Sequence, residues 1–231
     1  MTRSRTGGMA ATELDHLFIW ADVGGPEADQ LVAFGLTEGA PNTHPGQGTA
    51  CRRFFFRNAY LELLWVQDPA QAQSEAVAPT RLWSRWAERQ TGASPFGLGV
   101  RPLRPGTGGV PFPSWEYRPV YLPAPLAIHV GRDVPLSEPF WFYLGFARRP
   151  DDLAWPTRQP LEHAAGFSEI TAVRLTGPGL DKPSEAGQAV AQLAAVDLSE
   201  APEQLAEITI DGGGRQRVED FRPFLPLVFR W

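Results

Sequence analysis

Cysteine is almost absent from this chain of 231 residues, since Cys51 is the only one. A single cysteine excludes an intrachain disulfide and a Cys-based zinc cluster. The chain therefore does not need an oxidising compartment. Cys51 stands beside Arg52 and Arg53, which could lower its pKa, but a small core residue is the commoner role for such a cysteine.

Long hydrophobic runs are also missing. The start, MTRSRTGGMAATELDHL, lacks the apolar segment of a signal peptide, and no later stretch approaches about 18 uncharged apolar residues. We expect a cytoplasmic protein with a flexible N-terminus at residues 1–12 and no membrane partner.

Charge of one sign is not concentrated anywhere. The net charge of −5 is spread along the chain, so the clustered basic face of a nucleic-acid-binding protein is missing. No H-E-x-x-H or G-x-S-x-G pattern occurs, and the 4 histidines suggest no nucleophile triad. A nucleic-acid partner and the familiar hydrolase chemistries are excluded.

Apolar and aromatic residues, in contrast, are plentiful at the start of the chain. ELDHLFIWAD (13–22) is apolar on both faces, as in a strand covered on both sides. A helix should follow between Pro26 and Gly35. After a loop at 39–48, ACRRFFF and AYLELLWV predict two further strands around a tight reversal. The first unit therefore spans residues 13–67.

Proline dominates the middle of the chain, because residues 95–160 hold 13 of the 23 prolines. Such a density favours short strands and ordered turns. Ahead of it, a helix from Thr80 to Gln90 should bury Trp83 and Trp86. We assign residues 68–165 to this connecting helix and a proline-rich strand region.

The pattern of the first unit returns at residues 166–231, as strand, helix, strand, turn and strand. Units that each leave one sheet face uncovered can pair so that their sheets curve around a shared concave pocket. The fold class is α+β.

Three stretches together resemble a known family. LDHLFIWAD with a helix after it, HPGQGT leading into two strands, and AYLELLWV look like the glyoxalase-like domains of the vicinal oxygen chelate superfamily, which includes glyoxalases, bleomycin resistance proteins and dioxygenases. The similarity spans roughly residues 13–231. It implies paired βαβββ modules with curved mixed sheets around a shared cleft.

The resemblance also implies a divalent metal in the metal-dependent members, with His16 and Glu62 as its first ligand pair. Imidazole with carboxylate suits Zn, Fe, Mn, Ni or Co. An ionised carboxylate on an apolar strand needs a cation or a surface position. The alternatives are a backbone-bonded His16 and a Glu62 paired with Arg52 or Arg53.

His129 is our candidate for the third metal ligand, because Ala127 and Gly131 leave space beside its imidazole. Gly97 and Gly99 likewise suggest a hollow. A side chain at the rim is the alternative for His129. The C-terminal unit departs from the metal-dependent pattern, since Thr171 stands near the position that matches His16 and the last strand offers no Glu or His.

The HPGQGT loop is either a surface turn or a cleft loop in which His44, Gln47 and Thr49 contact a ligand. Two functions follow from these candidates. The first is a metalloenzyme of the lyase, isomerase or dioxygenase type, with Glu62 as a catalytic residue and a small oxygen-chelating substrate. The second is a metal-free protein that binds or sequesters a small molecule. An inert structural paralogue is a third reading, and the chain can also form a homodimer.

Overall fold

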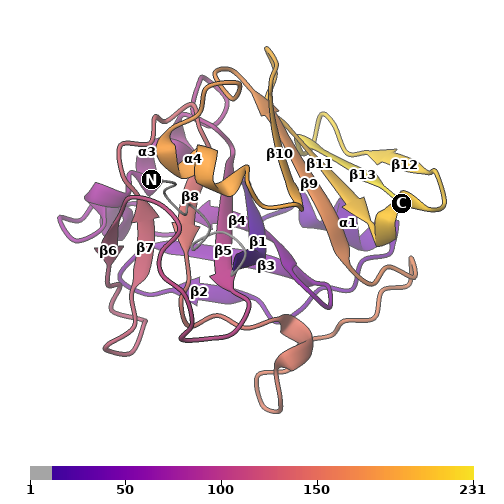
Figure 1. Cartoon of the computed structure of the whole chain (residues 1–231), viewed down its shortest axis with the longest axis horizontal. Helices are drawn as coiled ribbons and strands as arrows, with labels where there is room; N and C mark the ends of the chain where they lie inside the picture. The colour runs from indigo at the N-terminus through magenta and orange to yellow at the C-terminus, as the bar shows by residue number, and fades with distance from the viewer. Residues whose placement is uncertain (1–11) are drawn as a thin grey trace, which may run out of the picture.

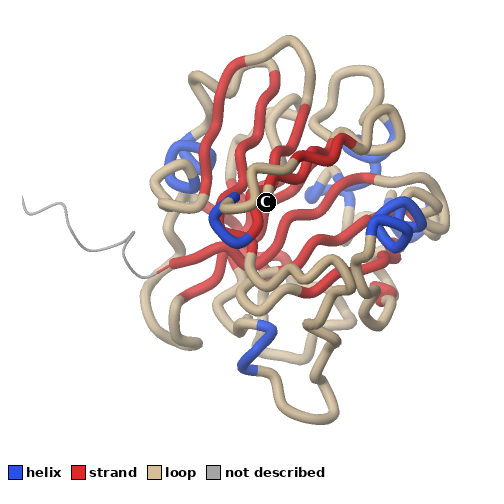
Figure 2. Tube along the Cα trace, turned by 90° about the vertical axis from the view of Figure 1, so that its right-hand side faces the viewer, coloured by secondary structure: helices blue, strands red, loops and turns tan. Residues whose placement is uncertain are grey.

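The computed structural model describes residues 12–231, which form two mixed β-sheets with short helices and long loops around them (Figures 1 and 2). The expected α+β class of paired, curled modules is confirmed. The flexible segment expected at 1–12 lies outside the described residues except for Thr12, which begins β1. Among the described residues, no helix has the length and apolar character needed to cross a membrane.

The larger sheet has 8 strands in the order β2-β3-β4-β1-β5-β8-β7-β6. Its strands are β1 (Thr12–Trp20), β2 (Asn42–His44), β3 (Thr49–Phe55), β4 (Tyr60–Val66), β5 (Phe96–Pro102), β6 (Ser114–Tyr117), β7 (Ile128–Gly131) and β8 (Phe140–Tyr143). The short strands lie toward both ends of the sheet.

The first half of this sheet is a βαβββ module. β1 leads through helix α1 (Ala28–Phe34) to the β2-β3-β4 meander, and β4 returns to lie parallel to β1. Gly35 ends α1 with a φ of 109°, a conformation that glycine adopts without strain. The loop expected at 39–48 contains β2, so HPGQGT is the turn of a β2-β3 hairpin.

The second half repeats this topology without a helix. β5 lies parallel to β8, and β6, β7 and β8 form an antiparallel meander. Antiparallel pairing of β1 with β5 joins the two modules. The proline-rich region therefore supplies the second module, through the short strands and ordered turns that its composition favours.

Gly97 and Gly99 of β5 allow the modules to pack closely. A Cβ atom on Gly97 would lie 2.1 Å from the ring of Phe18, and one on Gly99 would lie 2.7 Å from Phe142. The hollow expected beside these glycines is filled by aromatic rings, which in turn face the space between the modules.

The C-terminal segment forms a second sheet of 5 strands in the order β10-β9-β11-β13-β12. Its strands are β9 (Ile170–Gly177), β10 (Val196–Glu200), β11 (Leu205–Ile210), β12 (Val218–Asp220) and β13 (Leu227–Arg230), with helix α4 (Glu185–Val190) between β9 and β10. Across the small sheet the neighbouring strands pair in the order parallel, antiparallel, parallel, antiparallel. The strands β4-β1-β5-β8-β7 of the large sheet pair in the same order. The small sheet is a reduced copy of the centre of the large one.

The small sheet covers one face of the large sheet. Leu17 and Ile19 of β1 belong to one apolar core with Val173 and Ile208 of the small sheet. Helix α1 extends this contact, because the ring of Phe34 lies between 5.3 and 5.9 Å from four aromatic rings of the C-terminal segment. The opposite face of the large sheet carries a second apolar cluster that includes Phe18 and Phe142.

The remaining helices are short: α2 (Pro69–Ala72), α3 (Leu82–Ala87) and the 3-10 turns η1 (Ala78–Thr80), η2 (Pro150–Asp152) and η3 (Asp211–Gly213). The helix expected from Thr80 to Gln90 is reduced to α3. Trp83 and Trp86 are only half-buried, and Leu82 and Arg85 are the buried residues of α3 instead. The expectation of two buried tryptophans was therefore wrong.

Candidate functional site

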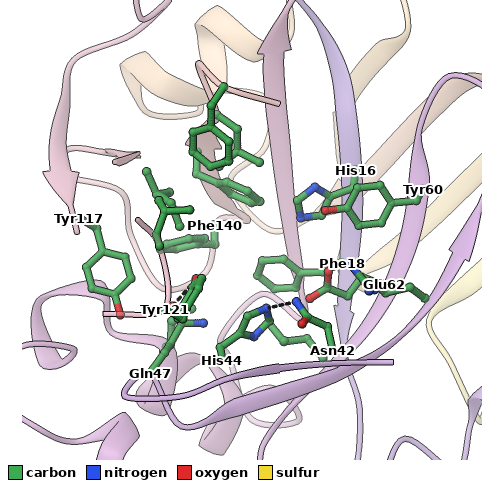
Figure 3. A pocket seen from close by; sticks show the side chains of 18 residues that line it. His16, Phe18, Asn42, His44, Gln47, Tyr60, Glu62, Tyr117, Tyr121 and Phe140 are labelled. Atoms are coloured by element: carbon green, nitrogen blue, oxygen red, sulfur yellow. Dashed lines mark hydrogen bonds between the residues drawn. The ribbon is translucent and has the colours of Figure 1, made fainter. Parts of the chain in front are cut away.

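A cavity of about 220 Å³ lies on the face of the large sheet that the small sheet leaves uncovered (Figure 3). Both modules line it, and β1 contributes from the centre. Residues up to Phe146 make up the described lining, so the C-terminal sheet contributes no side chain to it.

The two modules contribute different chemistry to this cavity. The first module supplies most of the polar and charged side chains, namely His16, Asn42, His44, Gln47, Arg53, Tyr60 and Glu62, together with Phe18 and Leu64. Helix α3 and the second module supply Leu82, Tyr117, Tyr121, Leu122, Ile128, Phe140, Phe142, Leu144 and Phe146. The described lining thus has one polar side, and one side that is aromatic and aliphatic apart from two tyrosine hydroxyls.

His16 reaches the cavity because of a bulge in β1. The register of β1 on β5 shifts between Leu14 and His16, which places Leu14 in the core between the sheets. Asp15 then lies beside His16, and its Oδ2 accepts a hydrogen bond from Nδ1 of His16 at 2.6 Å. An ionised carboxylate only accepts, so Nδ1 carries a proton, and in the neutral ring Nε2 is then the acceptor.

Arg101 and Tyr60 hold the Asp15–His16 pair in place from its two sides. The second oxygen of Asp15 accepts a hydrogen bond from Arg101 at 3.0 Å, and Asp15 and Arg101 are both buried. On the cavity side the His16 ring stacks on Tyr60, with 4.2 Å between ring centroids. The imidazole is thereby fixed in tautomer and orientation.

Glu62 points into the cavity from β4 (Figure 3). It alternates with Leu61 and Leu63, which face the core between the sheets. The side chain is 6% exposed. The two arginines considered as its partners bind elsewhere: Arg52 pairs with Glu38 and Asp29, and Arg53 donates to the backbone oxygen of Ala40. An arginine partner for Glu62 was therefore the wrong alternative.

Glu62 instead lies beside a thiol. Cys51, which is fully buried on the neighbouring strand β3, lies close to it, since the ligand atoms of the two side chains are within 4.8 Å of each other. Burial raises the pKa of the Cys51 thiol, and the negative charge of Glu62 raises it further. Among residues 12–231, no Arg, Lys or His nitrogen lies within 4.0 Å of the Glu62 carboxylate, so it forms no ion pair there.

The three residues expected to contact a ligand form one hydrogen-bonded group at the β2-β3 turn. Thr49 Oγ1 lies 2.8 Å from Nδ1 of His44 and accepts from Nε2 of Gln47 at 2.8 Å. Nε2 of His44 lies 3.0 Å from the side-chain nitrogen of Asn42 (Figure 3). Burial lowers the pKa of His44. His44 and Gln47 line the cavity, and Thr49 holds them from behind.

His129 lies apart from this group. On β7 its neighbour Ile128 lines the cavity, whereas His129 does not. Its ring lies 6.0 Å from that of Tyr143, which belongs to the core between the sheets. Side chains alternate along a strand, so the structure does not bring His129 together with His16 and Glu62.

Sequence reasoning missed several cavity residues. Tyr60 could have been found, because it shares the period-two face of Glu62 on β4. Tyr121 and Phe142 could not, since they come from the second module, whose pairing with β1 has no local signal. Cys51 was read as a core residue, although its ligand atom and those of His44 and Glu62 all lie within 4.8 Å of one another.

Comparison with known proteins agrees with this architecture over part of the chain. Residues 14–101 match the model of a family described as "Glyoxalase-like domain". The matched segment covers nearly all of the first module and β5, and the resemblance expected from the sequence is confirmed there. No curated protein matches the sequence.

Solved structures also align with this chain, and one of them covers nearly all of it. A crystal structure of a hypothetical protein from Staphylococcus aureus aligns with 95% of this chain and 99% of that chain. The sequence identity is 10% and the TM-score is 0.49.

Proposed function

We propose that this glyoxalase-like protein binds a small molecule that has an apolar, ring-containing body and a polar end carrying hydrogen-bond donors. The division of the cavity into one polar and one apolar side carries this proposal. Phe140 and Phe142 offer faces and edges to a ring, and the Glu62 carboxylate at the opposite side needs a donor or a cation.

The polar side of the cavity also determines which chemical group the polar end of the ligand should carry. His16 presents an acceptor nitrogen and Glu62 an acceptor carboxylate, so an anionic end would meet two acceptors. A ligand amine or hydroxyl would satisfy both. Binding would then remove apolar area of the ligand from water and give the buried carboxylate a partner.

The experiment compares three probes that share a phenyl ring, namely benzylamine, benzyl alcohol and phenylacetate, by NMR titration of the wild-type protein. We expect shifts at cavity residues, with benzylamine the strongest and phenylacetate the weakest ligand. Glu62→Gln should remove the preference for the amine. Glu219→Gln, which removes an exposed acid on the far sheet, should keep it. Equal binding of all three probes by wild type and Glu62→Gln would contradict the proposal.

A second candidate function is metal-assisted chemistry on such a ligand. The Asp15–His16 hydrogen bond favours it, because metal-bound imidazoles usually donate their other N–H to a carboxylate. A divalent ion bound at Glu62 would polarise an oxygen of the substrate as a Lewis acid. His16 and Glu62 would hold the reacting group between them, and the aromatic side would exclude water from it.

Whether a metal fits depends on which side chains of the cavity carry atoms that can bind it. On β5 and β8, the residues that face His16, Phe18 and the cavity are Gly97, Gly99, Phe140 and Phe142, which offer no ligand atom. The second module offers only the hydroxyls of Tyr117 and Tyr121 in the described lining, so the imidazole and carboxylate ligands of an ion would come from the first module. Elemental analysis of protein purified without an affinity tag distinguishes the two candidates, since a stoichiometric metal supports the second.

A further inference from the structure

We propose that the metal-binding set of this protein is Cys51, His44 and Glu62, with His16 left outside it as the residue that meets the ligand. The proposal uses the same cavity as the proposed function. Its probe is the metal ion alone, so its failure would leave ligand binding untouched.

The first argument is position. The three residues lie on three adjacent strands, β2, β3 and β4, and their ligand atoms all lie within 4.8 Å of one another. A tetrahedral zinc ion with bonds of about 2.0–2.3 Å separates its donors by roughly 3.3–3.6 Å. Side-chain rotations that shorten these separations would be enough to close the set around an ion.

The second argument is the charge of Glu62. Glu62 is 6% exposed, and the thiol of Cys51, whose pKa burial raises, lies beside its carboxylate. Arg53 lies opposite Glu62 on β3 and lines the same cavity, but it donates to the backbone oxygen of Ala40 and forms no ion pair with Glu62. Burial of the carboxylate is therefore not offset by direct contact with a cation. A divalent cation between Glu62 and Cys51 would supply that positive charge, and Cys51 would bind it as a thiolate after releasing its proton to solvent.

The third argument is the support behind His44. Its Nδ1 faces Thr49 Oγ1, and Gln47 donates to the same oxygen. A histidine that binds a metal through one ring nitrogen commonly has its other ring nitrogen held by a hydrogen bond of this kind. With Nδ1–H donating to Thr49, Nε2 would bind the ion once the Asn42 amide turns aside from it.

The set also differs from His16 in its chemistry. Among the described residues, the group whose ligand atoms all lie within 4.8 Å of one another contains His44, Cys51 and Glu62 but not His16. A thiolate, an imidazole and a carboxylate leave a fourth position of a tetrahedral ion open toward the cavity, as in catalytic zinc sites. The soft sulfur ligand favours zinc or cobalt over magnesium or manganese.

Cobalt titration tests the proposal directly. The full chain, purified without a histidine tag and stripped with a chelator, is titrated with Co²⁺. Cys51 is the only cysteine, so a thiolate-to-cobalt charge-transfer band in the near ultraviolet can come from no other residue. We expect this band to saturate at one ion per chain, and zinc to abolish it by displacement.

Three variants and one control complete the experiment. Cys51→Ser should lose the charge-transfer band, and His44→Ala and Glu62→Gln should bind at least 10-fold more weakly. His16→Ala should keep the band and the affinity. Circular dichroism of each stripped variant checks that it folds, and the wild-type spectrum with the His16→Ala control decides the outcome even if Cys51→Ser does not fold. Absence of cobalt binding, binding without the band, or loss of the band in His16→Ala would overturn the proposal.

Discussion

Asp15 and His16 are sequence neighbours on one strand, yet their side chains hydrogen-bond to each other at 2.6 Å, because a bulge interrupts the alternation of β1 between them. Asp15 at the same time accepts from the buried guanidinium of Arg101 at 3.0 Å. The orientation of a cavity imidazole thus depends on an ion pair buried behind the sheet.

Arg101 should therefore be a large contributor to stability. Arg101→Met leaves Asp15 buried without its cation, and we expect a loss of about 3–5 kcal/mol in the free energy of unfolding. Urea denaturation measures it. The control is Arg174→Met, which breaks an exposed pair with Asp197 and should cost less than about 1 kcal/mol. Equal midpoints for the two variants would contradict the role of Arg101.

Gly97 should tolerate no side chain. Gly97→Ala places a Cβ atom 2.1 Å from the Phe18 ring, so the ring must move into the cavity or the strands must separate. We expect a loss of about 1–3 kcal/mol, measured by thermal unfolding. Gly109→Ala is the control, because nothing lies within 4 Å of its added Cβ. A Gly97→Ala variant as stable as this control would show that Phe18 can rotate away freely.

Trp141 is the tryptophan whose removal should matter most. It is fully buried between the sheets, and its indole nitrogen donates to Glu138 at 3.1 Å. Trp141→Ala should cost about 3–5 kcal/mol. The half-buried Trp86 should cost less, and Trp155, which is 88% exposed, should change stability by no more than about 0.5 kcal/mol. The denaturation midpoint should therefore be lowest for Trp141→Ala and highest for Trp155→Ala. A midpoint for Trp155→Ala below that of Trp141→Ala would contradict this ranking.

His163 should make stability depend on pH. Burial lowers its pKa, and its Nδ1 accepts a hydrogen bond from the backbone of Thr37 at 2.9 Å, which the protonated ring could not do. The folded state therefore binds a proton less readily than the unfolded chain, whose histidine pKa is about 6.5. The stabilising contribution is complete above that pH and is lost as the pH falls below it.

The measurement for His163 is the slope of unfolding free energy against pH between about 7 and 5. His163→Gln should reduce the wild-type slope, whatever its effect on absolute stability. Burial lowers the pKa of His44 as well, so part of the slope should remain. A slope unchanged in His163→Gln would show that this imidazole does not titrate with unfolding.

Local patterns accounted for much of the first module. Alternation and turn residues predicted β1, β3 and β4, and Pro26 with Gly35 bounded α1, because these signals depend on neighbours along the chain. The resemblance over the same stretch indicated paired modules. The bulge at Asp15 had no such signal: strict alternation would place Leu14 on the face of His16, whereas it lies on the other.

The second module was beyond local reasoning. Its strands β6, β7 and β8 have four residues each, and a slip of one residue in a strand exchanges its faces. His129 and Ile128 illustrate this, since Ile128 lines the cavity and His129 does not. Proline-rich segments leave the register to tertiary contacts, here the pairing of β7 with β8.

The sequence by itself determined the α+β class, the first module and the presence of a carboxylate at Glu62 that apolar neighbours would bury. Only the tertiary structure decided what surrounds that carboxylate. His44 and Cys51 approach it through the β2-β3 hairpin, and the aromatic rings of the second module close the cavity through the pairing of β1 with β5. The reason is physical: periodicity reports which face of a strand is buried, whereas the partners across a sheet depend on which strands pair and in which register.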